Sequence, residues 1–474
     1  MQRWVEKIYE HSPVSLQDAM ISVYGLKLAR IRYAGGYKRY REELERSQYF
    51  SECALAELQD ERLRSLVRHC YDNVPYYAKL FRELRLAPSD FRTTSDLPKL
   101  PLLAKETVQS QPEQFYAQNY TNTPAEIVST SGTTGTTLRI RVDTEGRRKN
   151  YAFFSRFKAW TGVGPSGRTA TFAGRTIVPV KSQRPPFWRH NLAAHTILFS
   201  SYHLSEKNIP AYLAKLCDWD PHLIDSYPSS VEALARYALA YCVRAPHPRA
   251  IVTSSETLRT EQREAICKAF ATRVFDQYGG AEQVCFISQC EAGCYHIHPE
   301  YGVTEFIPDE ASDPKSACRI VATGFTNMAM PLLRYDIGDL AVPGGTPCSC
   351  GRKFRTVEEI IGRADDIIRT PDGRRVGRLD PVFKGLQTIR KAQIVQEDLR
   401  HILVRVVPGE GFRPGDLDSI RYELEKRLGR DVEYTFKLME EIPVGAGGKF
   451  RAVVCLIPKE SVPTHRKTDG ERLP

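Results

Sequence analysis

The segment IVSTSGTTGTTLRI, from Ile127 to Ile140, constrains the fold of this chain most, because a short apolar strand leads directly into nine residues that are all Ser, Thr or Gly. Glycine lets backbone N–H groups approach an anion closely, and the hydroxyl groups add further donors. The pattern predicts a strand followed by a phosphate-binding loop. The Gly-Lys-Ser/Thr ending of the kinase and GTPase loop is missing, which excludes that type of site. Because such runs are more often flexible linkers, the loop alone leaves both interpretations open.

Four later segments, taken in order with this loop, resemble motifs of the adenylate-forming superfamily, which includes acyl-CoA synthetases and peptide-synthetase adenylation domains. They are DQYGGAEQ (276–283), RYDIGDL (334–340), GRADD (362–366) and PVGAGGK (443–449). Within the superfamily the chain most resembles the phenylacetate-CoA ligase group, including its capsule-biosynthesis (CapK-type) branch. That resemblance depends on HCYDNVPYYAKLF (69–81), SYPSSVEALA (226–235) and TSSETL (253–258), and it covers roughly residues 55–455.

The resemblance implies an α/β fold with a large layered α/β N-terminal adenylation domain, a helical N-terminal extension and a small mobile α+β C-terminal domain. The residue patterns agree with this architecture. A chain of 474 residues also exceeds the length that one hydrophobic core usually supports, so more than one domain is expected. Strands are predicted at 125–128, 221–225, 249–253, 401–407 and 432–438, and helices at 55–70, 229–243 and 417–428. The expected boundaries are a helical extension at 1–100, the adenylation domain at 101–364, the small domain at 365–458 and a disordered tail at 459–474.

The composition favours a protein that handles small anions. The 67 basic residues are spread along the chain among 57 acidic ones, and no aromatic-and-basic recognition motif accompanies the net charge of +10, so we expect no nucleic-acid partner. One basic, tyrosine-rich segment at 24–41 is interpreted as a solvated helix face, with a membrane surface or an acidic partner as alternatives. No apolar run is long enough to cross a membrane, and no apolar signal core begins the chain, so a cytoplasmic protein is expected.

The resemblance also assigns roles to individual residues. Lys449 is the expected catalytic cation and Glu282 the expected magnesium ligand, since magnesium prefers carboxylate and phosphate oxygens. Thr134 joins Glu282 in the magnesium site, and Asp365 is the expected hinge. The expected nucleotide-binding residues are Ser129, Thr130, Ser131, Gly132, Thr133, Thr134, Gly135, Tyr278, Gly279, Asp339 and Arg363. The sequence departs from the family in having Ala281 where many members carry Thr, which puts one hydroxyl contact in doubt.

The acyl group is harder to place. Tyr227, Pro228 and Gly280 are expected to line the acyl pocket, although these residues could equally belong to the core. Ligases of this resemblance take flat aromatic acids. The segments PPFWRHN (185–191) and SSYHLS (200–205), however, look more like the capsule-biosynthesis branch, and this puts coenzyme A in doubt as the acceptor.

Six of the twelve cysteines gather between Cys285 and Cys350, and the cytosol keeps such thiols reduced. Two groups of Cys and His, at 290–298 and 348–350, suit a tetrahedral structural zinc built from two chain segments. By match to similar clusters in relatives, the expected ligands are Cys290, His296, Cys348 and Cys350. Cys294 and His298 are the alternative ligands. A metal-free set of thiols, a catalytic zinc and a nucleophilic cysteine are the competing interpretations.

Together these features predict an enzyme that uses ATP to activate a carboxylic acid, expected to be aromatic, as an acyl-adenylate with release of pyrophosphate. Acyl transfer to coenzyme A follows, as in phenylacetate-CoA ligase. The alternatives are transfer to an amine in polysaccharide or natural-product biosynthesis, and a non-catalytic nucleotide-binding protein. The expected cofactors are Mg²⁺ and a structural Zn²⁺, the expected small-molecule partners are the acid, ATP and an acceptor, and a homodimer is the expected assembly.

Overall fold

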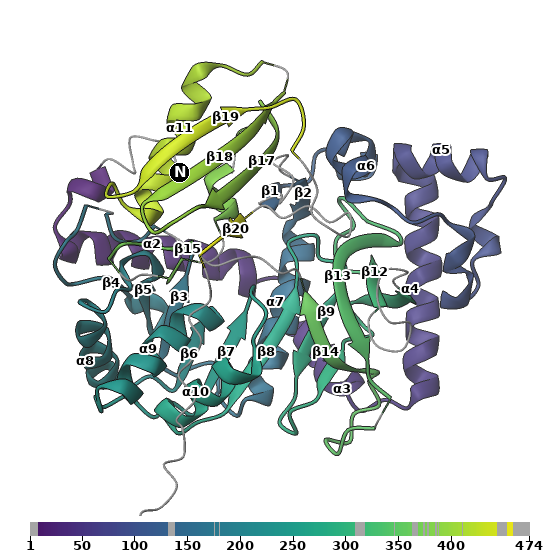
Figure 1. The fold of residues 1–474 in the computed structure, drawn as a ribbon. Helices are drawn as coiled ribbons and strands as arrows, with labels where there is room; N and C mark the ends of the chain where they lie inside the picture. Colours follow the sequence, from purple (N-terminus) through teal and green to yellow (C-terminus); the bar gives the residue numbers. More distant parts are fainter. Residues whose placement is uncertain are drawn as a thin grey trace, which may run out of the picture.

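A computed structural model gives the three-dimensional structure of the chain (Figure 1). It describes residues 8–130, 138–174, 176–179, 181–308, 318–345, 347–362, 368–372, 375–376, 379–383, 386, 388–409, 411–442 and 453–457. The side chains of Ser129 and Thr130 also lie outside the described set.

The described residues before position 100 are mainly helical, as predicted. The helices are α2 (Val14–Tyr33), α3 (Tyr37–Ser47), α4 (Glu52–Asn73) and α5 (Pro75–Glu83), followed by η1 (Pro88–Asp90), η2 (Thr94–Lys99), α6 (Lys105–Ser110), η3 (Pro112–Phe115) and η4 (Gln118–Tyr120). Helix α4 begins where Ser51 Oγ accepts a hydrogen bond of 3.2 Å from the Ala54 N–H. It buries Leu55, Leu63, Leu66, Val67 and Cys70 on one face. The predicted helix is therefore confirmed together with its apolar face.

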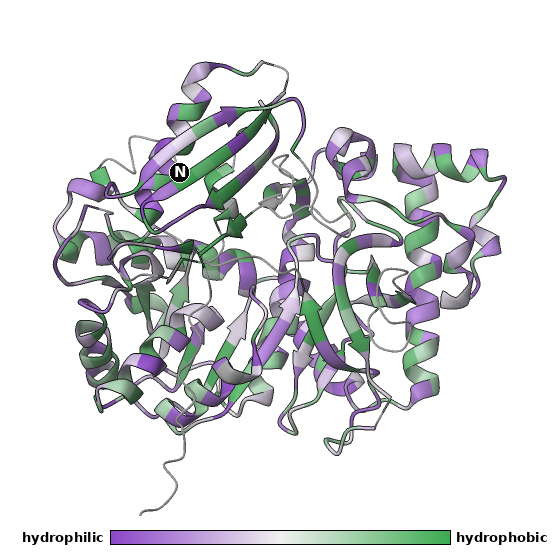
Figure 2. Cartoon of the chain, in the orientation of Figure 1, coloured by the Kyte–Doolittle hydropathy of each residue, from purple (hydrophilic) through white to green (hydrophobic). Residues whose placement is uncertain are grey.

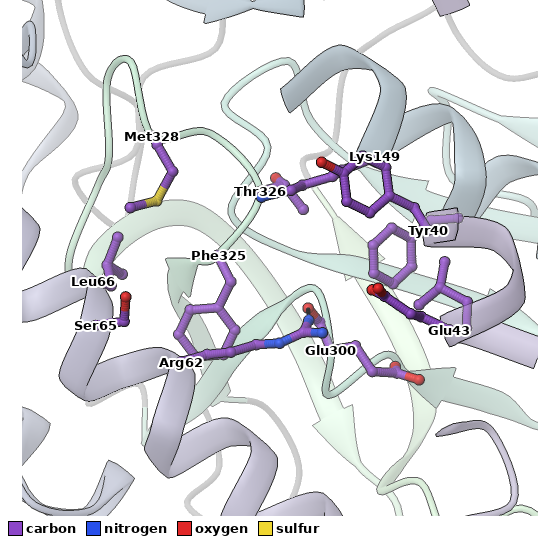
Figure 3. A pocket seen from close by; sticks show the side chains of 12 residues that line it. Tyr40, Glu43, Arg62, Ser65, Leu66, Lys149, Glu300, Phe325, Thr326 and Met328 are labelled. Atoms are coloured by element: carbon purple, nitrogen blue, oxygen red, sulfur yellow. Dashed lines mark hydrogen bonds between the residues drawn. The ribbon is translucent and has the colours of Figure 1, made fainter. Parts of the chain in front are cut away.

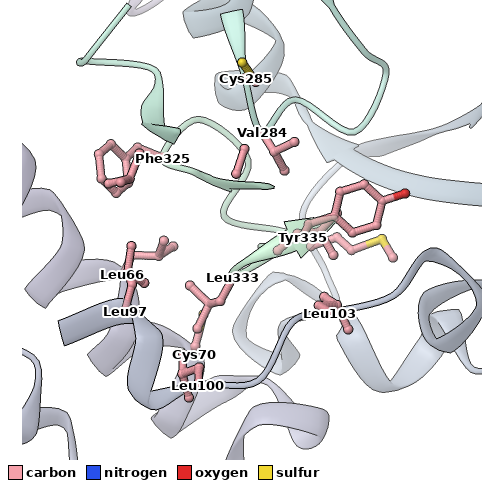
Figure 4. Packing of buried hydrophobic residues seen from close by; sticks show 14 of the residues in the cluster. Leu66, Cys70, Leu97, Leu100, Leu103, Val284, Cys285, Phe325, Leu333 and Tyr335 are labelled. Atoms are coloured by element: carbon pink, nitrogen blue, oxygen red, sulfur yellow. The ribbon is translucent and has the colours of Figure 1, made fainter. Parts of the chain in front are cut away.

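This helical segment shares a hydrophobic core with the strands far along the chain. Figure 4 shows Leu66, Cys70 and Leu100 beside Val284 and Leu333, and all five belong to one buried cluster. Tyr77 strengthens the junction, because its hydroxyl accepts a hydrogen bond of 2.8 Å from the Leu333 N–H. The extension is thus packed onto the adenylation region along its length.

A sheet of twelve strands forms the centre of the molecule, in the order β11-β12-β13-β14-β10-β9-β8-β7-β6-β3-β5-β4. Strands β3, β5, β6, β7 and β8 are parallel, and the others pair antiparallel. The parallel strands are β3 (Thr169–Ala173), β5 (Thr196–Ser200), β6 (Leu223–Ser226), β7 (Ala250–Ser254) and β8 (Val274–Gly279). The antiparallel strands are β4 (Trp188–Asn191), β9 (Phe286–Gln289), β10 (Tyr295–Ile297), β11 (Gly302–Pro308), β12 (Cys318–Gly324), β13 (Tyr335–Pro343) and β14 (Thr356–Gly362).

Helices cover both faces of the parallel half of this sheet, as a parallel sheet requires. On one face α8 (Ile209–Trp219), α9 (Pro228–Ala240) and α10 (Thr260–Phe270) pack on Phe172, Phe199 and Ile224. On the other face α7 (Thr144–Trp160) and α3 pack on Val252 and Phe275. The predicted layered α/β architecture is confirmed.

The strand that precedes the Ser/Thr/Gly loop is also present, but it lies outside the large sheet. β1 (Ala125–Thr130) pairs only with β2 (Leu138–Asp143), as an antiparallel two-stranded unit. Asp143 then caps α7 by accepting a hydrogen bond of 2.7 Å from the Gly146 N–H. The loop between the two strands, residues 131–137, lies outside the described residues.

The C-terminal part forms a small sheet of its own, in the order β19-β18-β17-β20, which lies above the large sheet in Figure 1. Its elements are β15 (Ile368–Arg369), β16 (Arg375–Val376), η7 (Asp380–Phe383), β17 (Ile389–Gln396), β18 (His401–Pro408), α11 (Pro414–Leu428), β19 (Glu433–Leu438) and β20 (Val453–Cys455). Ile394, Val404 and Leu424 belong to its own buried core. Figure 2 shows hydrophobic residues along its strands and mixed polar colouring on α11. Within the described residues, no helix combines the length and apolarity that a membrane crossing needs.

Candidate functional site

The parallel strands end at one edge of the large sheet, and several polar or predicted site residues lie at those ends. Tyr227 follows β6, Glu256 follows β7, and Gly279 is the last residue of β8. In open α/β sheets, ligands bind outside the carboxyl ends of the strands. We call these three positions, together with Tyr278, Gly280, Glu282 and Asp339, the carboxyl edge.

Tyr278 and Asp339 are in direct contact at this edge. The Tyr278 hydroxyl donates a hydrogen bond of 2.8 Å to Oδ2 of Asp339, which lies on β13. Three strands separate β8 from β13 in the sheet order, so the curvature of the sheet brings the two residues together. Both side chains are only half-buried. Two motifs that the sequence left separate thus form one polar unit that a ligand can reach.

Glu282 lies in the turn between β8 and β9, with its side chain half-buried. Its carboxylate lies directly beside Gly280, so a side chain at position 280 would displace Glu282 Oε2. The role of Gly280 in an acyl pocket remains a prediction.

The predicted acyl-pocket residue Tyr227 lies at the start of α9, and its hydroxyl accepts a hydrogen bond of 2.8 Å from the Gly174 N–H. Tyr202 donates to the carbonyl of the same glycine, also at 2.8 Å. Pro228 is the buried first residue of α9. The two tyrosines hold the end of β3 from both sides. Sequence reasoning missed Tyr202, and its position just after β5 is the signal that could have identified it.

Glu256 is a second residue that sequence reasoning missed. Its carboxylate accepts hydrogen bonds of 2.9 Å from the backbone N–H and from the hydroxyl of Ser229, in the first turn of α9. A carboxylate stabilises a helix N-terminus because the unpaired N–H groups there carry partial positive charge. Glu256 thus orients the helix that carries Tyr227 and Pro228.

Asp276, which begins the motif DQYGGAEQ, has a structural role. It accepts hydrogen bonds of 2.6 Å from Thr253 and 2.8 Å from the Tyr295 hydroxyl. Burial raises its pKa, and these hydrogen bonds oppose that rise. It therefore joins β7, β8 and β10 beneath the carboxyl edge.

Several predicted site residues lie outside the described part of the chain. They are Ser131, Gly132, Thr133, Thr134, Gly135, Arg363, Asp365 and Lys449, together with the side chains of Ser129 and Thr130. Their roles remain predictions.

The four expected zinc ligands come together at the opposite edge of the sheet. Cys290 follows β9, His296 lies on β10, and Cys348 and Cys350 lie in the loop before β14. Their ligand atoms all lie within 4.8 Å of one another, with Cys290 Sγ 3.5 Å from Cys348 Sγ and Cys350 Sγ 3.3 Å from His296 Nε2. We call these four residues the Cys/His cluster. Three thiols and one imidazole are a donor set that suits tetrahedral zinc.

The electrostatics of the cluster differ between its thiols and its imidazole. Burial raises the pKa of the Cys290 thiol to about 12 and that of Cys348 to about 11. Burial, followed by the charge of Arg352, lowers the pKa of His296 to about 4, so its ring is neutral, as a metal ligand requires. A bound cation would stabilise the thiolates and so lower the thiol pKa values that burial raises.

The alternative ligand His298 is engaged elsewhere. Its Nδ1 lies 2.6 Å from a guanidinium nitrogen of Arg156, and its Nε2 lies 2.8 Å from Ser288 Oγ. Its ring also stacks on Trp160, with centroids 5.0 Å apart. The other alternative, Cys294, packs beside the cluster without belonging to the four-ligand group.

Comparisons with known proteins show what the chain as a whole is similar to. Residues 368–455 match the family described as the CapK C-terminal domain. The chain is 27% identical to protein CapK of Staphylococcus aureus over 454 residues, covering 94% of this chain and 98% of the relative. It is 25% identical to phenylacetate-coenzyme A ligase of Thermus thermophilus, covering 85% and 96%.

The fold is similar to a crystal structure of 2-hydroxyisobutyryl-CoA ligase in complex with 2-HIB-AMP and CoA. The TM-score is 0.57 at 17% identity, covering 87% of this chain and 92% of the other. The likeness extends over both the large sheet and the smaller C-terminal part. The chain is therefore similar over nearly its full length to CapK and to phenylacetate-coenzyme A ligase, and it has the fold of an adenylate-forming ligase.

Proposed function

We propose that this ligase activates an aromatic carboxylic acid with ATP and then transfers the acyl group to coenzyme A. In the first step an oxygen of the carboxylate attacks the α-phosphorus of ATP, the bond to the β-phosphate oxygen breaks, and pyrophosphate leaves. In the second step a thiolate attacks the acyl carbon and AMP leaves. The observation that carries the proposal is the hydrogen bond between Tyr278 and Asp339 at the carboxyl edge, which joins two of the motifs that resemble this superfamily.

Asp339 suits the ribose of the nucleotide, because an ionised carboxylate is an acceptor with two oxygens. The hydrogen bond from Tyr278 fixes one of these oxygens in place. Glu282, with Thr134, would hold Mg²⁺, which neutralises phosphate charge as the leaving group departs. The Ser/Thr/Gly loop and Arg363 complete the proposed phosphate and ribose contacts.

Lys449 is the proposed catalytic cation. Two anions meet when the carboxylate approaches the phosphate, so the transition state needs positive charge between them. We propose that residues 365–458 rotate about Asp365 between the adenylating and the transferring step, because element-terminal residues typically absorb such changes in φ and ψ.

The acyl group would lie beside Tyr227 and Pro228, whose positions Glu256 and Gly174 fix. The tyrosine ring supports a flat aromatic acid as the substrate. The four ligands of the Cys/His cluster would leave no open position on zinc, so its role would be structural. It would anchor the loop before β14, the strand that leads to the GRADD segment.

A second candidate is transfer of the acyl group to an amine. The basis for this alternative is the sequence resemblance of residues 185–191 and 200–205 to the capsule-biosynthesis branch, and the match to CapK covers 94% of this chain. The adenylating step would be the same, and only the acceptor would differ.

The test is release of AMP and pyrophosphate from ATP, screened over aromatic, aliphatic and amino acids, each with coenzyme A, with an amine and with neither. A Lys449→Ala variant should lose about 10²- to 10³-fold of the acid-dependent rate. Its matched control is Lys353→Ala, a lysine in the loop before β14.

Acid-dependent AMP release that requires coenzyme A supports the acyl-CoA ligase, and release that requires an amine supports the second candidate. No release with any acid would indicate a nucleotide-binding protein without catalysis. Light scattering on the same sample tests the expected homodimer.

A further inference from the structure

A cavity of about 270 Å³ lies away from the carboxyl edge, where α3 and α4 meet α7 and the segment after β12. Figure 3 shows its lining: Arg62 and Leu66 from α4, Tyr40 from α3, Lys149 from α7, and Phe325 and Met328 from the segment after β12. The wall is largely apolar and aromatic, with two cations, Arg62 and Lys149, and two carboxylates, Glu43 and Glu300. The volume is close to the lower limit for small-molecule pockets, so the space suits a small metabolite.

Lys149 is the most unusual group of the lining. Within the described chain its half-buried ammonium makes no recorded hydrogen bond or ion pair, and it lies 5.5 Å from the centre of the Tyr40 ring. The nearest carboxylates on its own helix are engaged elsewhere. Asp143 caps α7, and Glu145 accepts hydrogen bonds from Tyr40 and Arg148. Burial lowers the pKa of Lys149, which is the expected effect on a desolvated cation without a partner.

Arg62 supplies a second positive charge. It donates a hydrogen bond to the backbone carbonyl of Glu300 and takes part in no ion pair within the described residues. The lining also contains two carboxylates, and each has a cation of its own. Glu300 pairs with Arg156 at 2.6 Å, and Glu43 pairs with Arg39 at 3.6 Å. The two carboxylates of the lining are therefore paired with cations other than Arg62 and Lys149.

We propose that this cavity binds a small organic anion, with its carboxylate or phosphate oxygens between Arg62 and Lys149 and its apolar part against Phe325 and Met328. An ammonium and a guanidinium form strong charge-assisted hydrogen bonds with either kind of oxygen. Desolvated cations gain most from an anionic ligand, because they have already lost their water.

The cavity is connected to the carboxyl edge through Thr326. This buried lining residue donates a hydrogen bond of 3.2 Å to the carbonyl of Gln283, which has a φ of 56° and directly follows Glu282. A ligand that moves the segment after β12 would change the backbone next to the proposed magnesium ligand. The site is thus an effector site. This coupling rests on the proposed function, whereas the binding itself does not.

Calorimetric titration tests the binding, with sodium benzoate, inorganic phosphate and pyrophosphate as three separate probes. The Lys149→Gln variant is compared with Lys38→Gln, a lysine of α3 whose side chain is 87% exposed. At least one probe should bind the wild-type protein, with affinity about tenfold or more weaker in Lys149→Gln and unchanged in Lys38→Gln. Comparison of the affinities for benzoate and phosphate decides whether the site prefers carboxylate or phosphate oxygens.

Three outcomes would overturn the proposal: no probe binds, Lys149→Gln binds as tightly as wild type, or Lys38→Gln weakens binding equally. Circular dichroism of each variant checks that the chain is folded. For the coupling, the probe should change the KM for ATP of the wild-type protein, and this change should be absent in Lys149→Gln at the same probe concentration. A chain that does not adenylate at all fails only the KM measurement, and the titrations still decide whether the cavity binds anions.

Discussion

The segments that precede and follow strand β9 in the chain differ sharply. Before the strand, Glu282 lies in a turn beside exposed glycines and is half-buried. After the strand come the Cys/His cluster, strand β10 and then Glu300, which is 1% exposed and bonded to Arg156 and Ser47. Both segments contain a carboxylate.

The difference shows how one residue type serves two purposes. A carboxylate buried at the end of a network is fixed by its partners and contributes to the fold, because leaving it unpaired would be costly. A carboxylate at the open end of parallel strands keeps oxygens that a ligand can reach. Substitutions after β9 should therefore lower stability, and substitutions before β9 should lower activity in a protein of normal stability.

The largest effect is expected from Cys348→Ser. Structural zinc contributes about 10–16 kcal/mol of apparent binding free energy in zinc-finger peptides, so loss of one thiolate should remove most of the metal and lower the melting temperature by many degrees. Elemental analysis should find one zinc per chain in wild type and almost none in the variant. Cys294→Ser and the exposed Cys53→Ser are controls and should keep the metal. A wild-type protein without zinc would contradict the structural-zinc proposal.

Glu300→Gln should have the next largest effect. It leaves the buried Arg156 guanidinium without its counter-ion, and breaking a buried pair in this way typically costs about 3–5 kcal/mol. Denaturant unfolding measures the loss. The matched control is Glu42→Gln on α3. Its exposed carboxylate forms a solvent-screened ion pair of 3.9 Å with Lys38, so the free energy of unfolding should not change measurably. Equal stability of the two variants would disprove the buried-pair argument.

The same pair predicts a pH dependence. Burial alone would raise the pKa of Glu300, but the charge of Arg156 and hydrogen bonds from Arg156 and Ser47 outweigh it and lower the pKa. A carboxyl group with a lowered folded pKa stabilises the protein above its unfolded pKa of about 4.3, and that contribution disappears as the pH falls through the folded value. The free energy of unfolding should fall more steeply below pH 4.3 in wild type than in Glu300→Gln.

Before β9, Glu282→Gln should reduce acid-dependent AMP release by about 10²-fold, because the proposed magnesium site would lose a charged ligand while the turn keeps its shape. The melting temperature should stay close to that of wild type, since the side chain is half-buried. Raising the Mg²⁺ concentration should recover part of the rate. A variant that is unstable instead of inactive would place Glu282 with the structural carboxylates.

The smallest effect is expected from Tyr278→Phe, which removes one hydrogen bond of 2.8 Å to Asp339. A hydrogen bond to a charged group contributes about 1.5–3 kcal/mol, so the KM for ATP should rise by about tenfold or somewhat more. Asp339→Asn should raise the KM for ATP by a smaller factor in the Tyr278→Phe background than in the wild-type protein, since the two residues form one unit. Fully additive effects would show that they act separately.

Much of the fold could be predicted from sequence. The periodic leucines of α4 and the apolar runs of β6, β7 and β18 are local patterns, and each element is found where its pattern lies. The pairing of β1 with β2 alone was not predictable, because an apolar run does not specify its partner strand. The site was partly predictable. Residue type and spacing indicate metal ligands at Cys290, His296, Cys348 and Cys350. The roles of Tyr202 and Glu256 became evident only when the structure placed the strand ends together.

By itself the sequence determined which chemical groups were present, in which order, and which segments were helical or extended, since those properties depend on neighbours along the chain. The tertiary structure decided what these groups do. Twisting of the sheet brings Tyr278 to Asp339 across three intervening strands. The antiparallel direction of β9 places the Cys/His cluster at the opposite edge of the sheet from Glu282. Packing of α3 and α4 near α7 forms the cavity that contains Arg62 and Lys149. The physical reason is that burial and distance set the value of a charge or a hydrogen bond, and both depend on residues far apart in the chain.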